Sequence, residues 1–140
     1  MGKRGYPDFY TPPVGVTITR VDTGTINIDA GTQPVIDVVT ERGRLLYLTI
    51  YVSAPKEVIR ILCDGEIVDM ASPEELALNG VGADGYPWAL GYYYIDVAGR
   101  MRYRTPLTWA EGLSVQPDRP APSAYTLRVE VVYEVIPRAV

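Results

Sequence analysis

Cys63, the only cysteine of the chain, directly precedes Asp64 and Gly65 in the stretch EVIRILCDGEIVD. A thiol beside a carboxylate could act as a nucleophile, but it usually needs a base such as histidine. The chain contains no histidine, which also removes Ser-His-Asp triads and most zinc and non-haem iron sites. Asp-Gly between two β-rich runs is a strong hairpin signal, because both residues tolerate positive φ. We therefore interpret Cys63 as a small apolar residue where a strand reaches a turn.

Clustered carboxylates could serve glycoside hydrolysis. The closest along the chain are Asp64, Glu66, Asp69, Glu74 and Glu75. Asp64 is explained by the turn and Glu75 by a helix cap, and we expect Glu66 and Asp69 on opposite faces of a strand. Calcium bound by loop carboxylates such as Asp84 stays open, although no EF-hand spacing, phosphate loop or dinucleotide fingerprint is present. The sequence predicts no catalytic residue, no metal site and no cofactor.

An aromatic constellation could bind a ligand. Tyr86 and Trp88 lie in the loop GVGADGYPWALG, and Tyr92 and Tyr94 follow in the YYY run. Together they could form a platform that stacks on sugar rings. The alternative, which we prefer, is that Trp88 closes one end of the domain while alternate tyrosines enter the core. Trp109 is expected in the core.

The first thirteen residues, MGKRGYPDFYTPP, show neither strand nor helix periodicity. Proline stiffens this segment, and aromatic side chains are spaced along it. We therefore predict an extended N-terminal arm over residues 1–13, followed by a single domain over 14–140. Its candidate partner-binding residues are Tyr6, Pro7, Phe9, Tyr10, Pro12 and Pro13.

Behind these residues the chain reads as short alternating runs separated by turn residues. Strands are predicted at 14–21, 25–29, 34–40, 44–53, 57–63, 66–70, 92–97, 101–105, 106–116 and 125–136. Asp22-Thr23-Gly24 should turn the first run into the second as a hairpin, and 92–97 should pair with 101–105. In 44–53 we expect Leu46, Leu48, Ile50 and Val52 on one face. The last run is long enough to need a bend or bulge.

One helix is predicted over SPEELALNG, residues 72–80, with Ser72 as cap, Pro73 at its first position and Gly80 at its end. Nine or ten short strands with one helix predict an all-β fold, an antiparallel sandwich or jelly roll.

The composition limits the classes of partner that we expect the chain to bind. A formal charge of −4 is unlike a nucleic-acid-binding domain. No apolar run approaches the roughly 20 residues that span a bilayer, so no membrane partner is expected. Arginine makes up 11 of the 13 basic residues and tyrosine 11 of the 14 aromatics. Both are enriched at protein interfaces. A GC-rich genome or a hot habitat, with a thermostable protein, would explain the same skew.

From Pro34 to Ile136 the layout resembles small β-sandwich structural proteins of tailed bacteriophages, including capsid decoration (cement) proteins and head or tail fibre modules. The resemblance lies in RLLYLTIYVSAPKEVIRILCDGEIV, RTPLTWAEGLSV and the closing YTLRVEVVYEVI. It implies a non-enzymatic protein made in the host cytoplasm and placed on the virion surface. Its partners would be the major capsid protein or other virion subunits, with a homo-oligomer, a trimer favoured. The alternative is a carbohydrate- or receptor-binding tail-fibre module that uses the aromatic loop 86–94.

Overall fold

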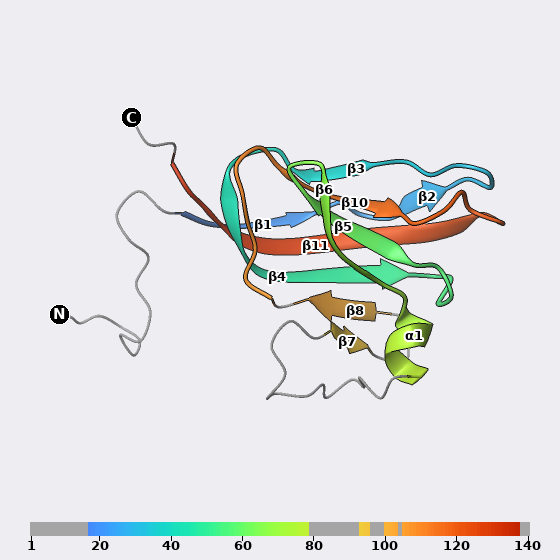
Figure 1. Ribbon diagram of the computed structural model, residues 1–140. Helices are drawn as coiled ribbons and strands as arrows, with labels where there is room; N and C mark the ends of the chain where they lie inside the picture. The colour runs from blue at the N-terminus through green and yellow to red at the C-terminus, as the bar shows by residue number, and fades with distance from the viewer. Residues whose placement is uncertain (1–16, 79–92, 96–99, 104, 138–140) are drawn as a thin grey trace.

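The structure, a computed structural model, describes residues 17–78, 93–95, 100–103 and 105–137. Two antiparallel sheets make up the fold (Figure 1). The larger sheet has the order β1 (Thr17–Asp22), β11 (Tyr125–Val135), β4 (Gly43–Val52), β8 (Arg100–Tyr103) and β7 (Tyr93–Ile95). In addition, β2 (Ile26–Ile28) pairs with β11, and β9 (Thr108–Trp109) pairs with β4.

The smaller sheet has the order β3 (Ile36–Val39), β10 (Leu113–Pro117), β5 (Ile59–Cys63) and β6 (Glu66–Ala71). A short helix, α1 (Pro73–Leu78), follows β6. The predicted all-β antiparallel sandwich with one short helix is confirmed.

Both sheets contribute to one hydrophobic core. Along β11 every second side chain is buried, as the period-2 pattern predicted: Tyr125, Leu127, Val129, Val131 and Tyr133. They join inward-facing residues of β4 and of the smaller sheet, among them Leu48, Ile50, Ile59, Ile61 and Val115. Trp109 is buried in the same cluster, as predicted. Its indole Nε1 donates to the carbonyl oxygen of Glu41 at 2.7 Å, so burial leaves no polar atom of the ring unpaired.

Two local predictions are confirmed in detail. Asp64 and Gly65 have φ of 54° and 83°, and they connect β5 to β6 as a hairpin. At the start of α1 the Ser72 hydroxyl accepts the backbone N–H of Glu75 at 3.1 Å and contacts the Glu75 carboxylate at 3.2 Å. The structure describes the helix to Leu78, and the predicted end at residues 79–80 lies outside the described residues.

The hairpin predicted at Asp22-Thr23-Gly24 is wrong. Instead of pairing with each other, β1 and β2 both pair antiparallel with β11, one after the other along the same edge. The three residues form an interruption in this edge strand. Thr23 keeps contact with β11 there: its N–H donates to the Val129 carbonyl and its hydroxyl accepts the Val129 N–H, each at 3.0 Å. Gly24, at φ 69°, supplies the turn without reversing the chain.

The face prediction for residues 44–53 is wrong at Leu46. Tyr47 pairs with Val132 and Leu45 with Tyr133, so Leu46 is an extra residue in β4. Leu45 is buried while Leu46 is 37% exposed. The bulge expected in the last strand, β11, therefore occurs in its pairing with β4, and β4 carries the extra residue. The run 106–116 also divides, into β9 in the larger sheet and β10 in the smaller sheet.

Candidate interaction surface

Most site residues predicted from sequence lie outside the described part of the chain. These are the arm residues Tyr6, Pro7, Phe9, Tyr10, Pro12 and Pro13 and the loop residues Tyr86, Trp88 and Tyr92. For Tyr94 the structure describes the backbone, which pairs with Arg102 as part of the predicted pairing of β7 with β8. The described residues do bring another set of arginines and tyrosines together.

The outward side of the larger sheet carries this set. Side chains alternate between the two faces of a strand. The core-facing residues of β4 and β11 include Leu48, Ile50, Val129 and Val131, so the residues next to them along each strand point to the outer face. We call the resulting surface the Arg-Tyr face and define it by Arg20, Asp22, Arg44, Tyr47, Tyr51, Arg100, Arg102, Arg128, Glu130 and Glu134. It spans four neighbouring strands, β1, β11, β4 and β8.

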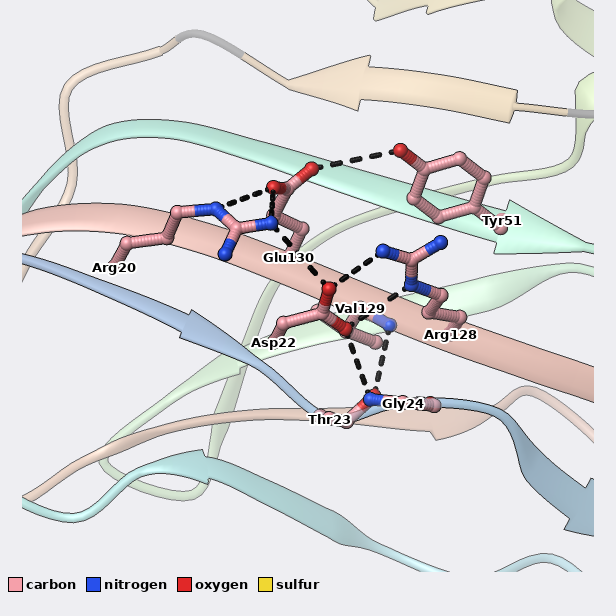
Figure 2. A network of polar contacts seen from close by, with 8 residues as sticks. All are labelled: Arg20, Asp22, Thr23, Gly24, Tyr51, Arg128, Val129 and Glu130. Carbon is pink, nitrogen blue, oxygen red and sulfur yellow. Dashed lines mark hydrogen bonds and ion pairs between the residues drawn. The ribbon is translucent and has the colours of Figure 1, made fainter.

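A hydrogen-bonded network connects β1 to β11 on this face (Figure 2). Asp22 receives two hydrogen bonds from Arg128, one at 3.0 Å and one at 2.5 Å, and a third from the Gly24 backbone N–H at 2.9 Å. Glu130 accepts the Arg20 Nε–H at 2.6 Å and lies 3.5 Å from the Tyr51 hydroxyl. Such two-pronged guanidinium–carboxylate contacts fix side-chain directions. The network therefore holds the face in one arrangement.

These contacts keep the network charged. The pKa of the Asp22 carboxyl lies well below its usual value, chiefly because Arg128 donates to it and secondly because Gly24 does. The same pairing raises the pKa of Arg128. Salt and counter-charges, rather than protonation near neutral pH, should control what this face binds.

Tyrosine rings lie beside three guanidinium groups of the face. Arg128 from β11 lies 4.9 Å from the centre of the Tyr51 ring, and Arg100 from β8 lies 5.8 Å from it. Arg102 lies 5.2 Å from the centre of the Tyr47 ring, and its Nε–H donates to the fully buried Thr49 hydroxyl at 3.1 Å. Stacking on a ring favours a guanidinium over an ammonium group. This accounts for arginine rather than lysine at these positions.

A second polar feature lies at the Asp64 turn. The Asp64 carboxylate accepts the backbone N–H groups of Ala110, Glu111 and Gly112 at 2.9, 2.6 and 3.0 Å, which lowers its pKa. Asp64 thus joins the β5–β6 hairpin to the crossing between β9 and β10. A groove beside it is lined by Val35, Asp37, Thr40, Leu62, Asp64, Glu111 and Ser114. We call it the acidic groove.

Cys63 has the environment of a core residue. It is buried, and burial together with the nearby Asp64 charge raises the pKa of the thiol to about 11. A thiol that stays protonated at neutral pH is a poor nucleophile. The interpretation of Cys63 as an apolar residue at a strand end is confirmed.

The expectation for Glu66 and Asp69 is wrong. Val68 is an extra residue in β6, so both acids pair with inward-facing residues, Cys63 and Ile61, on one side of the strand. Asp69 accepts the Met70 N–H at 2.8 Å, whereas Glu66 is exposed.

Across the described residues no three His, Cys, Asp or Glu side chains are grouped as metal ligands. Within the same residues no helix has the length and apolar character needed to cross a bilayer.

The Arg-Tyr face as a whole was not predicted from sequence, although signals for it exist. Arg100 and Arg102, Tyr47 and Tyr51, and Arg128 and Glu130 each sit at even spacing within a strand. Even spacing places side chains on one face. Which strands are neighbours decides whether those faces join, and that information is not local.

The fold defines the class as an antiparallel two-sheet β-sandwich. No protein-family model matches the chain, and no curated protein matches it. Among solved structures it is similar to a chain of the structure described as the cyanophage Pam1 capsid asymmetric unit. The sequence identity is 13%, the match covers 96% of this chain and 94% of that chain, and the TM-score is 0.51. At this identity the similarity establishes a shared fold.

Proposed function

We propose that this chain is a non-enzymatic structural protein of a phage virion, which decorates and stabilises the capsid. The observation that carries the proposal is the fold similarity to a capsid chain over nearly the full length of both chains. Fold alone does not determine function, so the surface chemistry has to agree with it.

The Arg-Tyr face supports the same proposal. Arginine and tyrosine are enriched among residues that dominate binding energy at protein interfaces. Here their side chains are held by ring stacking and hydrogen bonds before any partner arrives. Groups that are already ordered lose less conformational entropy on binding. A sheet face of this kind suits a lasting contact with another protein.

The N-terminal arm is the proposed contact with the shell. The arm would lie across a neighbouring virion subunit and bury its three aromatic side chains, Tyr6, Phe9 and Tyr10. At about 25 cal/mol per Å² of apolar area, two buried aromatic anchors would contribute several kcal/mol before ordering costs. Exposed strand edges, such as that of β1 at one end of the larger sheet, would add pairing with neighbouring subunits.

Co-sedimentation with capsids tests both parts of the proposal. The full chain and a variant lacking residues 1–13 are mixed with virions and empty heads of the phage whose genome encodes the chain. We expect saturable binding of the full chain, a higher heat-disruption temperature of the heads, and binding by the truncated chain at least about tenfold weaker. Unchanged binding after truncation would refute the arm mechanism. Failure of the full chain to bind would refute the decoration proposal itself.

A further inference from the structure

Charge is unevenly distributed between the Arg-Tyr face and the rest of the chain. The five arginines and three carboxylates of the face give it +2, which leaves −6 for the remaining residues of a chain whose formal charge is −4. The face is thus a cationic surface on an acidic protein. Such segregation favours oriented contacts, because complementary patches steer association.

Arg102 is the residue of this face best prepared to receive a carboxylate. Its Nε–H donates to the Thr49 hydroxyl, and its guanidinium group lies over the Tyr47 ring. Within the described residues its two terminal amino groups make no hydrogen bond and no ion pair. A guanidinium held in place with its outer edge unused matches the two oxygens of a carboxylate.

The acidic groove offers that carboxylate chemistry on the other side of the sandwich. Asp37 points outward from β3 and is exposed, and Asp64 and Glu111 line the same groove. The apolar side chains of Val35, 55% exposed, and Leu62 also line it. Since Asp37 and Ser114 pair on the outer side of the smaller sheet, the groove faces away from the Arg-Tyr face. One molecule cannot bring the two together, but two copies can.

We propose that copies of this chain associate head to tail, with the Arg-Tyr face of one copy against the acidic groove of the next. Arg102 would meet the groove carboxylates, and Tyr47 would pack on the apolar part of the groove. Contacts between two different surfaces form a closed ring when the rotation between copies closes, and an open chain when it does not. This association needs no capsid, so it goes beyond the proposed function and can fail independently of it.

Charge reversal tests the contact. The purified full-length chain, Arg102→Glu and Asp37→Arg are compared by sedimentation velocity and native mass spectrometry at 50 and 500 mM salt. We expect wild type to self-associate at 50 mM salt and at least about tenfold more weakly at 500 mM, because salt screens surface charges. Each reversal should weaken self-association at least about tenfold. Lys56→Glu and Asp29→Arg, reversals at exposed positions outside both surfaces, should behave as wild type.

Two recombinations separate a specific contact from general charge repulsion. An equimolar mixture of Arg102→Glu and Asp37→Arg should form a one-to-one complex, since one variant keeps an intact groove and the other an intact face. The double variant Arg102→Glu/Asp37→Arg should regain self-association. Arg100→Glu replaces Arg102→Glu if circular dichroism shows that the latter is unfolded. A wild-type monomer at 100 µM and 50 mM salt, or a mixture without a complex, would overturn the proposal, whatever the capsid assay gives.

Discussion

Gly43 begins β4 at a point where two large aromatic side chains pack against the backbone. A Cβ atom at this position would lie 2.8 Å from Cζ2 of Trp109, 2.9 Å from Cδ2 of Tyr133 and 3.1 Å from the carbonyl oxygen of Glu134. Ordinary contacts between such atoms are roughly 3.5–4.0 Å. Gly43→Ala therefore requires the rings to move by several tenths of an ångström or the backbone to shift.

Neither ring is free to move. Trp109 and Tyr133 are 3% and 2% exposed, and they contact each other with ring centres 5.8 Å apart. Both are also tied to Glu41: the Trp109 indole donates to its carbonyl at 2.7 Å and the Tyr133 hydroxyl to its carboxylate at 2.6 Å. Overpacking a rigid core costs about 1–3 kcal/mol, and we place this case near the upper end.

A second effect of the substitution offsets part of this loss of stability. Alanine has less conformational freedom than glycine in the unfolded chain, and this raises the free energy of unfolding by about 0.4–1 kcal/mol. A net loss of about 2 kcal/mol remains. For a chain of 140 residues, about 2.1 cal/mol/K of unfolding entropy per residue converts this loss into a fall in Tm of about 7 °C.

Differential scanning calorimetry of Gly43→Ala beside wild type measures this fall directly. Thr17→Ala, a small change at an exposed position of β1, is the control and should change the free energy of unfolding by less than about 0.5 kcal/mol. A Gly43→Ala midpoint within 2 °C of wild type would contradict this expectation. It would mean that the cluster around Trp109 adjusts at little cost.

Three further predictions concern titration and access. Burial, together with Glu41, raises the pKa of Tyr133 to about 12. Because this folded-state pKa lies above the unfolded value, the stabilisation is complete below pH 10 and is lost as pH rises through 12. Tyr133→Phe should therefore flatten the alkaline fall of Tm between pH 9 and 12. The N–H groups of Ala110 and Glu111 lower the pKa of Asp64. The contribution of Asp64 to stability is therefore present above the usual pKa of an aspartate and is lost as pH falls below that value. Asp64→Asn should flatten the acid fall of Tm between pH 5 and 2. An unchanged slope in either variant would contradict the assignment. Cys63 should react with a thiol reagent at pH 8 only after denaturant is added, and rapid labelling of native protein would show that β5 is not packed as described.

Local sequence signals predicted the parts of the fold that depend on local chemistry. Asp64-Gly65 has the positive φ values that its residue types favour, and Ser72 with Glu75 begins the helix as expected. The alternation in β11 placed the buried side chains from Tyr125 to Tyr133 correctly, although Glu134 on the other face is buried as well. In each case the residues that determine the structure lie within one turn or one strand.

The errors occurred where distant strands decide the result. Asp22-Thr23-Gly24 has turn chemistry, yet pairing with β11 on both sides keeps the chain running forward. The extra residues Leu46 and Val68 change which side chains face inward, and only the partner strand reveals them. The Arg-Tyr face escaped prediction for the same reason, since it is assembled from four strands far apart in the sequence.

The proposed function requires the chain to be part of a virion. Mass spectrometry of gradient-purified virions, from the phage whose genome encodes the chain, tests this claim most directly. We expect peptides of the chain to co-purify with the major capsid protein through the gradient, in a fixed ratio of copies to shell subunits. Absence of the chain from virions whose other structural proteins are detected would contradict it.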